Sequence, residues 1–135
     1  MKETYQIPKD LLYTSKHEWV KVIDEKTAIV GITDYAQDMM KEIVFVELPE
    51  LGKKVSQMES VAAVESVKSV SDVFSPLGGE ILEINKELES EPEVVNNDPY
   101  GRGWIFKLRI GNMKEVEELM SPEKYKEHID KLSES

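Results

Sequence analysis

The residue with the clearest chemical potential in this chain is Lys68, a single base in an acidic and apolar stretch. No other lysine or arginine lies between Lys54 and Lys86, and residues 61–74 around it are rich in valine. Acidic residues surround it in the sequence at Glu59, Glu65, Asp72, Glu80 and Glu83. A lone lysine in this setting is either an incidental surface charge or an amine that the fold presents to another protein.

The segments on either side of Lys68 predict how it is presented. The residues Ser66-Val67-Lys68-Ser69 follow one short run of strand character and precede another, which is typical of a hairpin turn. A hairpin tip projects its side chain into solvent and leaves the body of the fold undisturbed.

The electrostatic setting separates two uses of this amine. A charged lysine is a poor nucleophile, and catalysis by it requires desolvation or a neighbouring cation. The carboxylates around Lys68 act in the opposite sense, because they favour the ammonium form. The sequence therefore predicts an acceptor that a second enzyme acylates, rather than a Schiff-base catalyst.

No other set of residues assembles a catalytic centre. The two histidines, His17 and His128, are far apart in sequence and fall in different predicted elements, with His128 on the packing face of its helix. No spacing supports a metal pair or a Ser-His-Asp set. The glycines at 78–79 and 101–103 suit turns better than phosphate binding. Cysteine is absent, which excludes disulfides, thiolate catalysis and cysteine-based metal sites.

Length and composition predict one domain, residues 1–135, that binds neither nucleic acid nor membranes. The chain has 135 residues, 40% of them hydrophobic, and no apolar run approaches the roughly 20 residues of a membrane span. The formal net charge is -10, so phosphate backbones and anionic membranes would be repelled. This charge serves solubility, or it steers the chain toward basic protein surfaces.

The first residues bear on location. They lack the apolar core of a signal peptide and the arginine-rich, acid-poor character of a transit peptide. The absence of cysteine fits a reducing compartment. We expect a cytoplasmic location in a prokaryote, with the mitochondrial matrix an option only if Met1 is not the native start.

The predicted elements are many short strands with few helices. A polar lead-in covers residues 1–12, and strands follow at 18–23, 27–32, 43–48, 54–64 (one or two strands), 80–84 and 103–110. The first two strands form a hairpin around residues 24–26. Within 54–64 the inward candidates are Val55, Met58 and Val61.

Two helices are expected, one internal and one C-terminal. Thr33 can cap the internal helix, whose apolar face would hold Tyr35, Ala36, Met39 and Met40. Ser121 and Pro122 mark the start of the other helix, within a C-terminal helical segment at 112–135. Residues 85–100 are expected to form a long polar connection. The pattern predicts a small β barrel or sandwich closed by a terminal helix.

An ordered set of segments resembles the glycine cleavage system H protein family over residues 13–130. Val64-Glu-Ser-Val-Lys68, followed by Ser75-Pro76 and Gly79-Glu-Ile81, resembles the lipoyl-lysine segment of that family. The likeness extends to residues 17–20, 31–38, 43–49, 96–101 and 103–105. Met40-Lys41 departs from the Leu-Gly usual in the family, which bears on a local turn.

The resemblance implies a fold, a cofactor and partners. The fold would be a mostly β, lipoyl/biotinyl-type barrel-sandwich hybrid with a short internal helix and a C-terminal helix. An (R)-lipoate would be joined to Lys68 by a lipoate ligase or an octanoyltransferase. It would carry the methylamine group of glycine from the glycine decarboxylase (P protein) to the aminomethyltransferase (T protein), and the dihydrolipoyl dehydrogenase (L protein) would reoxidise it. The chain would be a non-catalytic carrier in glycine catabolism.

Four residues besides Lys68 are candidates for binding the lipoyl-lysine arm that the resemblance implies, or for recognition by the enzyme that attaches the lipoyl group. A loaded arm ends in an amine, and its storage would favour a cleft with acceptors and little water. Glu18 and Asp72 are the candidate arm-docking acids, with solvated strand-end acids as the alternative for both. Glu65 and Ser66 are candidate recognition elements for the lipoylating enzyme, although Ser66 could instead close the turn by bonding to the backbone.

Other functions stay open at this stage. A lipoyl-relay protein would supply lipoate to other enzymes. Lipoyl domains of 2-oxoacid dehydrogenases share the fold but typically have aspartate before the modified lysine, and biotin carriers have methionine on both sides, where this chain has Val67 and Ser69. In an unmodified interaction module or a small enzyme, Lys68 would be an incidental charge.

Overall fold

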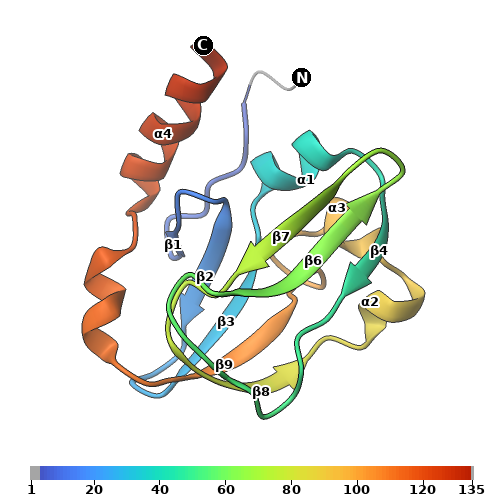
Figure 1. The fold of residues 1–135 in the computed structure, drawn as a ribbon. Coiled ribbons are helices and arrows are strands. Elements are labelled where there is room, and N and C mark those ends of the chain that lie inside the picture. The colour runs from blue at the N-terminus through green and yellow to red at the C-terminus, as the bar shows by residue number, and fades with distance from the viewer. Residues whose placement is uncertain (1–3, 135) are drawn as a thin grey trace.

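Two antiparallel sheets make up the body of the protein in a computed structural model that describes residues 4–134 (Figure 1). The larger sheet has the strand order β1-β2-β3-β9-β8-β5, and the smaller has the order β4-β6-β7. The strands are β1 Leu12–Tyr13, β2 Glu18–Val22, β3 Thr27–Ile32, β4 Ile43–Glu47, β5 Lys54–Val55, β6 Ser60–Ser66, β7 Val70–Phe74, β8 Gly79–Ile84 and β9 Phe106–Ile110. The predicted mostly β class is confirmed.

Helices lie at the edges of the two sheets. They are α1 Asp34–Met40, α2 Glu87–Ser90, α3 Val94–Asn97, the 3₁₀ helix η1 Met113–Glu118 and α4 Pro122–Glu134. Thr33 caps α1 as expected, since its hydroxyl accepts a hydrogen bond from the backbone N–H of Ala36. Ser121 does the same for α4 through the N–H of Lys124. The internal and C-terminal helices are therefore both confirmed.

The main core lies between the sheets, because strand residues alternate between an inward and an outward direction. The larger sheet contributes Ala28, Val30, Phe106 and Leu108, and the smaller contributes Val46, Val64 and Val73. All of these side chains are at most 2% exposed. Burial of each large apolar side chain stabilises the fold by roughly 1.5–3 kcal/mol.

A second apolar cluster fixes the two ends of the chain to the larger sheet. It contains Tyr13 and Trp19 from the sheet and Tyr125 and Ile129 from α4. The rings of Tyr13 and Tyr125 stack with centroids 4.7 Å apart. Tyr13 and Met120 also exchange two backbone hydrogen bonds of 2.9 and 2.7 Å. These contacts hold α4 beside β1, as Figure 1 shows.

The N-terminal lead-in is less polar in its contacts than the sequence suggested. Tyr5 and Ile7 pack against the second cluster, and Leu11 is 5% exposed within it. The hydroxyl of Tyr5 donates to Asp38 of α1 at 2.8 Å. From residue 4 onward, this segment is therefore part of the packing around α1.

The prediction that Met58 faces inward is wrong. Met58 has a positive φ of 64° and is 37% exposed. It lies in the turn between β5 and β6, which belong to different sheets, so the chain changes direction at this point. Val55 is buried and Val61 packs against the core, as expected.

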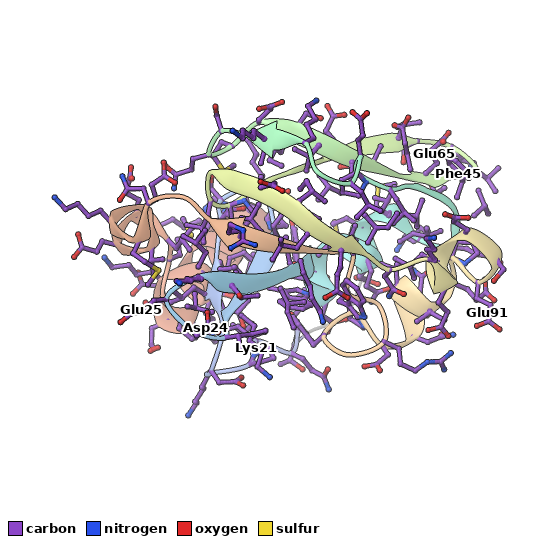
Figure 2. The ribbon with its side chains drawn as sticks, turned by 90° about the horizontal axis from the view of Figure 1, so that it is seen from below. Lys21, Asp24, Glu25, Phe45, Glu65 and Glu91 are labelled. Carbon is purple, nitrogen blue, oxygen red and sulfur yellow. The ribbon has the colours of Figure 1, made fainter. Side chains whose placement is uncertain are left out.

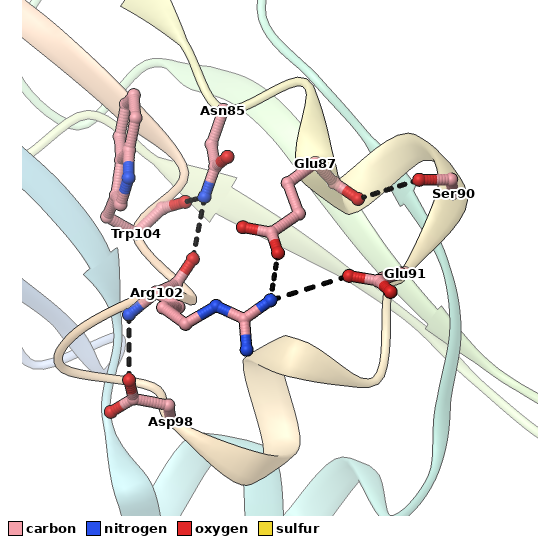
Figure 3. Close-up of polar contacts among 7 residues, drawn as sticks. All are labelled: Asn85, Glu87, Ser90, Glu91, Asp98, Arg102 and Trp104. Carbon is pink, nitrogen blue, oxygen red and sulfur yellow. Dashed lines mark hydrogen bonds and ion pairs between the residues drawn. The ribbon is translucent and has the colours of Figure 1, made fainter.

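The segment at 85–100 is also more ordered than predicted, because α2 and α3 lie within it (Figure 3). Leu88 of α2 and Val94 and Val95 of α3 are buried. The amide of Asn85 donates to the carbonyl oxygens of Arg102 and Trp104, both at 2.7 Å. At the surface, the Arg102 guanidinium forms ion pairs with Glu87 and Glu91. Buried apolar side chains, rather than these exposed charges, account for the order.

Gly79 lies where β8 approaches β9 too closely for any side chain. A Cβ added at Gly79 would lie 1.8 Å from the carbonyl oxygen of Arg109. Gly79→Ala must therefore separate the strands, and we expect the free energy of unfolding to fall by at least about 3 kcal/mol. Gly111→Ala is the matched control, because the nearest atom to its added Cβ is 3.4 Å away. Denaturant unfolding measures both, and equal midpoints would contradict the prediction.

Candidate functional site

Lys68 lies at the tip of the β6–β7 hairpin, where it is exposed to solvent. The backbone N–H of Ser66 donates to the carbonyl oxygen of Ser69 at 2.9 Å, which closes a turn with Val67 and Lys68 in its centre. The Oγ atoms of Ser66 and Ser69 are 3.1 Å apart. The expected hairpin is therefore present with the lysine at its tip, and Ser66 takes part in closing the turn.

Two neighbouring cavities lie between this hairpin and α1. The larger has a volume of about 400 Å³ and is bordered by residues 39–42 and by the tip residues 66–69. The smaller has a volume of about 100 Å³ and contains both Glu18 and Asp72 in its wall. Met39 and Met40 border both cavities. The structure thus brings the two candidate docking acids together and places Lys68 at the adjoining cavity.

Glu18 is a buried carboxyl group, with only 1% of its surface exposed. Its Oε1 accepts a hydrogen bond from the Thr14 hydroxyl at 2.5 Å, and its Oε2 accepts one from the backbone N–H of Phe74 at 3.1 Å. Thr14 Oγ1 itself accepts from the N–H groups of Lys16 and Glu18, so its own proton is directed to the carboxylate.

The protonation of Glu18 is set by two opposing effects. Burial raises the pKa of Glu18 from 4.5 to about 7, although the hydrogen bonds from Thr14 and Phe74 act to lower it. The nearby charge of Lys16 also lowers this pKa by a smaller amount. The carboxyl group is therefore poised between its two protonation states near neutral pH.

Asp72 and Lys16 bring opposite charges to the same small cavity. Both side chains are exposed, and Asp72 also borders a cavity of about 230 Å³ next to Glu47 and Lys53. Sequence reasoning did not single out Lys16. Its position two residues before Glu18 was the available signal, because Lys16 lies in the turn that leads into β2 and Glu18 is the first residue of that strand.

An aromatic cluster, not expected from the sequence, joins this turn to α4. The rings of His17 and His128 stack with centroids 5.7 Å apart. His17 Nδ1 lies 2.9 Å from the Tyr125 hydroxyl, which lies 2.7 Å from Thr33 Oγ1 at the start of α1. Burial lowers the pKa of His17 from 6.5 to about 4, and the charges of His128 and Lys16 act in the same sense.

The role of this cluster is to hold the residues that precede Glu18. His17 adopts a positive φ of 76°, and its carbonyl oxygen accepts a hydrogen bond from the N–H of Thr33. His128 Nε2 donates to the carbonyl oxygen of Ser15 at 3.0 Å. Sequence reasoning missed these contacts because they form only when α4 docks on the sheet.

Residues 4–134 contain neither a candidate metal cluster nor a helix that could span a membrane. Within that range, no three histidine, aspartate or glutamate side chains are grouped so that they could hold a metal ion. No helix in the described part is long and apolar enough to cross a membrane.

Comparison with known proteins gives a consistent result. Residues 11–132 match the family model described as glycine cleavage H-protein. The chain is 51% identical over 126 residues to the glycine cleavage system H protein of Halothermothrix orenii, and this match covers 93% of this chain and 98% of that one. It is 56% identical over 121 residues to the probable glycine cleavage system H protein 1 of Sulfolobus acidocaldarius, with coverages of 90% and 87%.

A solved structure agrees with the fold. The crystal structure of a glycine cleavage system H protein from Mycobacterium marinum matches with a TM-score of 0.77 at 36% sequence identity. The match covers 88% of this chain and 95% of that one. The similarity therefore extends over both sheets and is not confined to the hairpin.

Proposed function

The chain belongs to the glycine cleavage H-protein family and is a lipoyl carrier of the glycine cleavage system, and from that premise we propose that Lys68 bears the lipoyl group. The observation that carries the proposal is the exposed position of Lys68 at the tip of a tight hairpin. An acylating enzyme can reach its amine there without disturbing either sheet.

The residues around the tip fit an attached (R)-lipoyl group. The cavity of about 400 Å³ beside Lys68 is bordered by Met39, Met40 and Val67, whose apolar side chains suit a hydrocarbon chain. When bound, lipoate supplies a disulfide that accepts the methylamine group of glycine as the disulfide is reduced. The protein contributes attachment, orientation and protection from water.

Glu18 and Asp72 are proposed to hold the amine end of the loaded arm. They share one small cavity, and an ammonium group there would donate charge-assisted hydrogen bonds to the two carboxylates. The positive charge of the amine would also favour the ionised form of Glu18. Ile32 and Val64 in the same wall would keep bulk water away.

Removal of either acid is expected to speed the loss of methylamine from the loaded protein. Hydrogen bonds to charged groups contribute about 1.5–3 kcal/mol, so Glu18→Ala should raise the release rate roughly 10- to 100-fold. Asp72→Ala should have a smaller effect, because exposed charges are screened. The measurement is the loss of the isotopically labelled methylamine group over time, followed as the formaldehyde and ammonia that water forms when it breaks the S–C and C–N bonds.

The matched control for this experiment is Glu47→Ala. Glu47 and Asp72 flank Ala63 on the small sheet, and Glu47 does not border the cavity that contains Glu18. Glu18→Gln serves as the variant that preserves the size of the side chain. Unchanged release rates in both Glu18→Ala and Asp72→Ala would refute the docking role.

The partners proposed for the carrier follow from its family. They are the glycine decarboxylase (P protein), the aminomethyltransferase (T protein), the dihydrolipoyl dehydrogenase (L protein) and a lipoate ligase or octanoyltransferase. We propose that the chain catalyses none of their steps, with Glu65 and Ser66 read by the lipoylating enzyme. Its bacterial and archaeal relatives support a cytoplasmic location in a prokaryote.

Reconstitution tests the proposed function. The protein is lipoylated in vitro, its modified peptide is identified by mass spectrometry, and glycine-dependent formation of NADH is followed with the P, T and L proteins. We expect one lipoyl adduct, on Lys68, and turnover that depends on it. The lipoyl-relay alternative predicts instead that lipoyl groups pass to 2-oxoacid dehydrogenase domains without glycine turnover.

A further inference from the structure

The outward face of the small sheet carries a row of exposed apolar side chains beside the hairpin tip. Phe45 lies opposite Glu65, and Glu65 lies opposite Val70, across β4, β6 and β7. Val46 and Val64, one position along their strands, are 2% exposed and face the core, so this row faces solvent. Phe45 is 50% exposed and Val70 is 64% exposed.

We use the name tip face for this surface, which consists of Val44, Phe45, Glu65, Val67 and Val70. Val44 and Val67 are also exposed, the latter to 81%. Figure 2 shows Phe45 and Glu65 next to each other, at the end of the molecule opposite to Lys21, Asp24 and Glu25. Aromatic residues are enriched, and charged residues depleted, in the cores of protein interfaces. The composition of the tip face therefore suits contact with another protein.

We propose that the tip face is the docking surface for the enzyme that acylates Lys68. That enzyme would contact the tip face with apolar side chains and would place an arginine or lysine opposite Glu65. The proposal rests on attachment of the lipoyl group at Lys68. In that reaction, the deprotonated Nζ forms an amide with the carbonyl carbon of a lipoyl adenylate. The bond from that carbon to the phosphate oxygen breaks, AMP leaves, and the amine proton passes to solvent.

The tip face adjoins the turn that contains Lys68, and this position favours the acylating enzyme as its partner. Glu65 and Val70 form the last cross-strand pair of the hairpin, directly before the turn that contains Lys68. An enzyme that forms a bond at Nζ must enclose the tip, and so it must cover the strand faces that lead into the tip. Enzymes that later meet the protein through a long flexible arm are under no such constraint.

The charge of Glu65 identifies the chemistry of the partner. Glu65 is half-buried between Phe45 and Val70, and no ion pair of it is found within residues 4–134. The chain has a net charge of -10, so a partner with a basic surface is also favoured at long range. A cation opposite Glu65 would fix the register of the complex, as complementary charges do at interfaces.

The experiment compares Phe45→Lys with Ile23→Lys in the unmodified protein. Ile23 is 51% exposed and lies next to Asp24 at the opposite end of the molecule, so the two substitutions are matched in exposure and charge. Two quantities are measured with a purified lipoate ligase, lipoate and ATP. The first is kcat/KM for acylation of Lys68, with product formation followed by intact-mass spectrometry. The second is the Kd of the unmodified protein for the ligase. Thermal unfolding checks that both variants are folded.

We expect Phe45→Lys to lower kcat/KM and raise Kd by at least about tenfold, and Ile23→Lys to change both by less than about twofold. Glu65→Gln should raise Kd and make binding less sensitive to salt. If the wild type is acylated at Lys68 but Phe45→Lys has the same kcat/KM and Kd as Ile23→Lys, the proposed docking surface is refuted. The proposed attachment site is then still supported. If no acylation occurs at Lys68 of the wild type, the proposed attachment and the docking surface both fall.

Discussion

Lys68→Arg is expected to abolish lipoylation and, with it, all glycine-dependent turnover. Arginine keeps the positive charge and the length of the side chain, but its guanidinium does not lose a proton in proteins and cannot serve as the acceptor amine. The side chain at this position is exposed at a hairpin tip, so the fold should be unaffected. The measurements are intact mass after incubation with the lipoylating enzyme, and formation of NADH in the reconstituted system.

Lys41→Arg provides the control for this experiment. Lys41 is exposed and borders the same cavity as Lys68, so an acylating enzyme that selected lysines by proximity alone would encounter both. We expect Lys41→Arg to be lipoylated at the wild-type rate. A lipoyl adduct on another lysine in Lys68→Arg, accompanied by glycine turnover, would contradict the assignment of a single attachment point.

The hairpin that presents Lys68 could be predicted from the sequence because its determinants are local. Strand character on each side of Ser66–Ser69 and the alternation of Glu65 with apolar neighbours are sufficient to define a turn. The caps of α1 and α4 are local in the same sense, since Thr33 and Ser121 bond to N–H groups three residues later.

Other parts of the site depend on contacts between distant segments, and these have no local signal. The stacking of His17 on His128 requires α4 to dock beside β1, which is decided by burial of Tyr13 and Tyr125. Order in the segment at 85–100 depends on burial of Leu88, whose neighbours in the sequence are charged. The polarity of that segment concealed the few apolar side chains that position it.

The burial of Glu18 also could not be inferred from its sequence position. A glutamate at the start of a strand is ordinarily solvated, whereas here Thr14 and Phe74 donate to both of its oxygens within the protein. The hydrogen bond from the backbone N–H of Phe74 to the Glu18 side chain links β7 to β2 across the two sheets. The same contact places the carboxyl group in the small cavity, so its structural and proposed docking roles share one cause.

Two buried groups of the site have opposite effects on the dependence of stability on pH. The pKa of Glu18 is raised from 4.5 to about 7, so its contribution to stability is fully present below pH 4.5 and is lost as pH rises through 7. The pKa of His17 is lowered from 6.5 to about 4, so its contribution is present above pH 6.5 and is lost as pH falls through 4. Between about pH 4.5 and 6.5 the two slopes oppose each other.

Glu18→Gln is expected to separate these two effects. Glutamine does not titrate, so the difference in free energy of unfolding between wild type and Glu18→Gln should reflect Glu18 alone. The wild-type advantage should shrink by about 3 kcal/mol between pH 4 and pH 8, since one pKa unit corresponds to about 1.4 kcal/mol. In the variant itself, the slope from His17 remains, and stability should rise with pH from about 4 to 6.5.

Urea unfolding at half-unit steps of pH measures this difference directly. Glu18→Ala should show the same dependence of the difference on pH with an added constant loss, because the hydrogen bonds to Thr14 and Phe74 are removed at every pH. A difference that stays constant with pH in both variants would mean that Glu18 titrates alike in the folded and unfolded chain. Burial would then not control its protonation, and the cavity would not hold a carboxyl group poised to respond to an incoming cation near neutral pH.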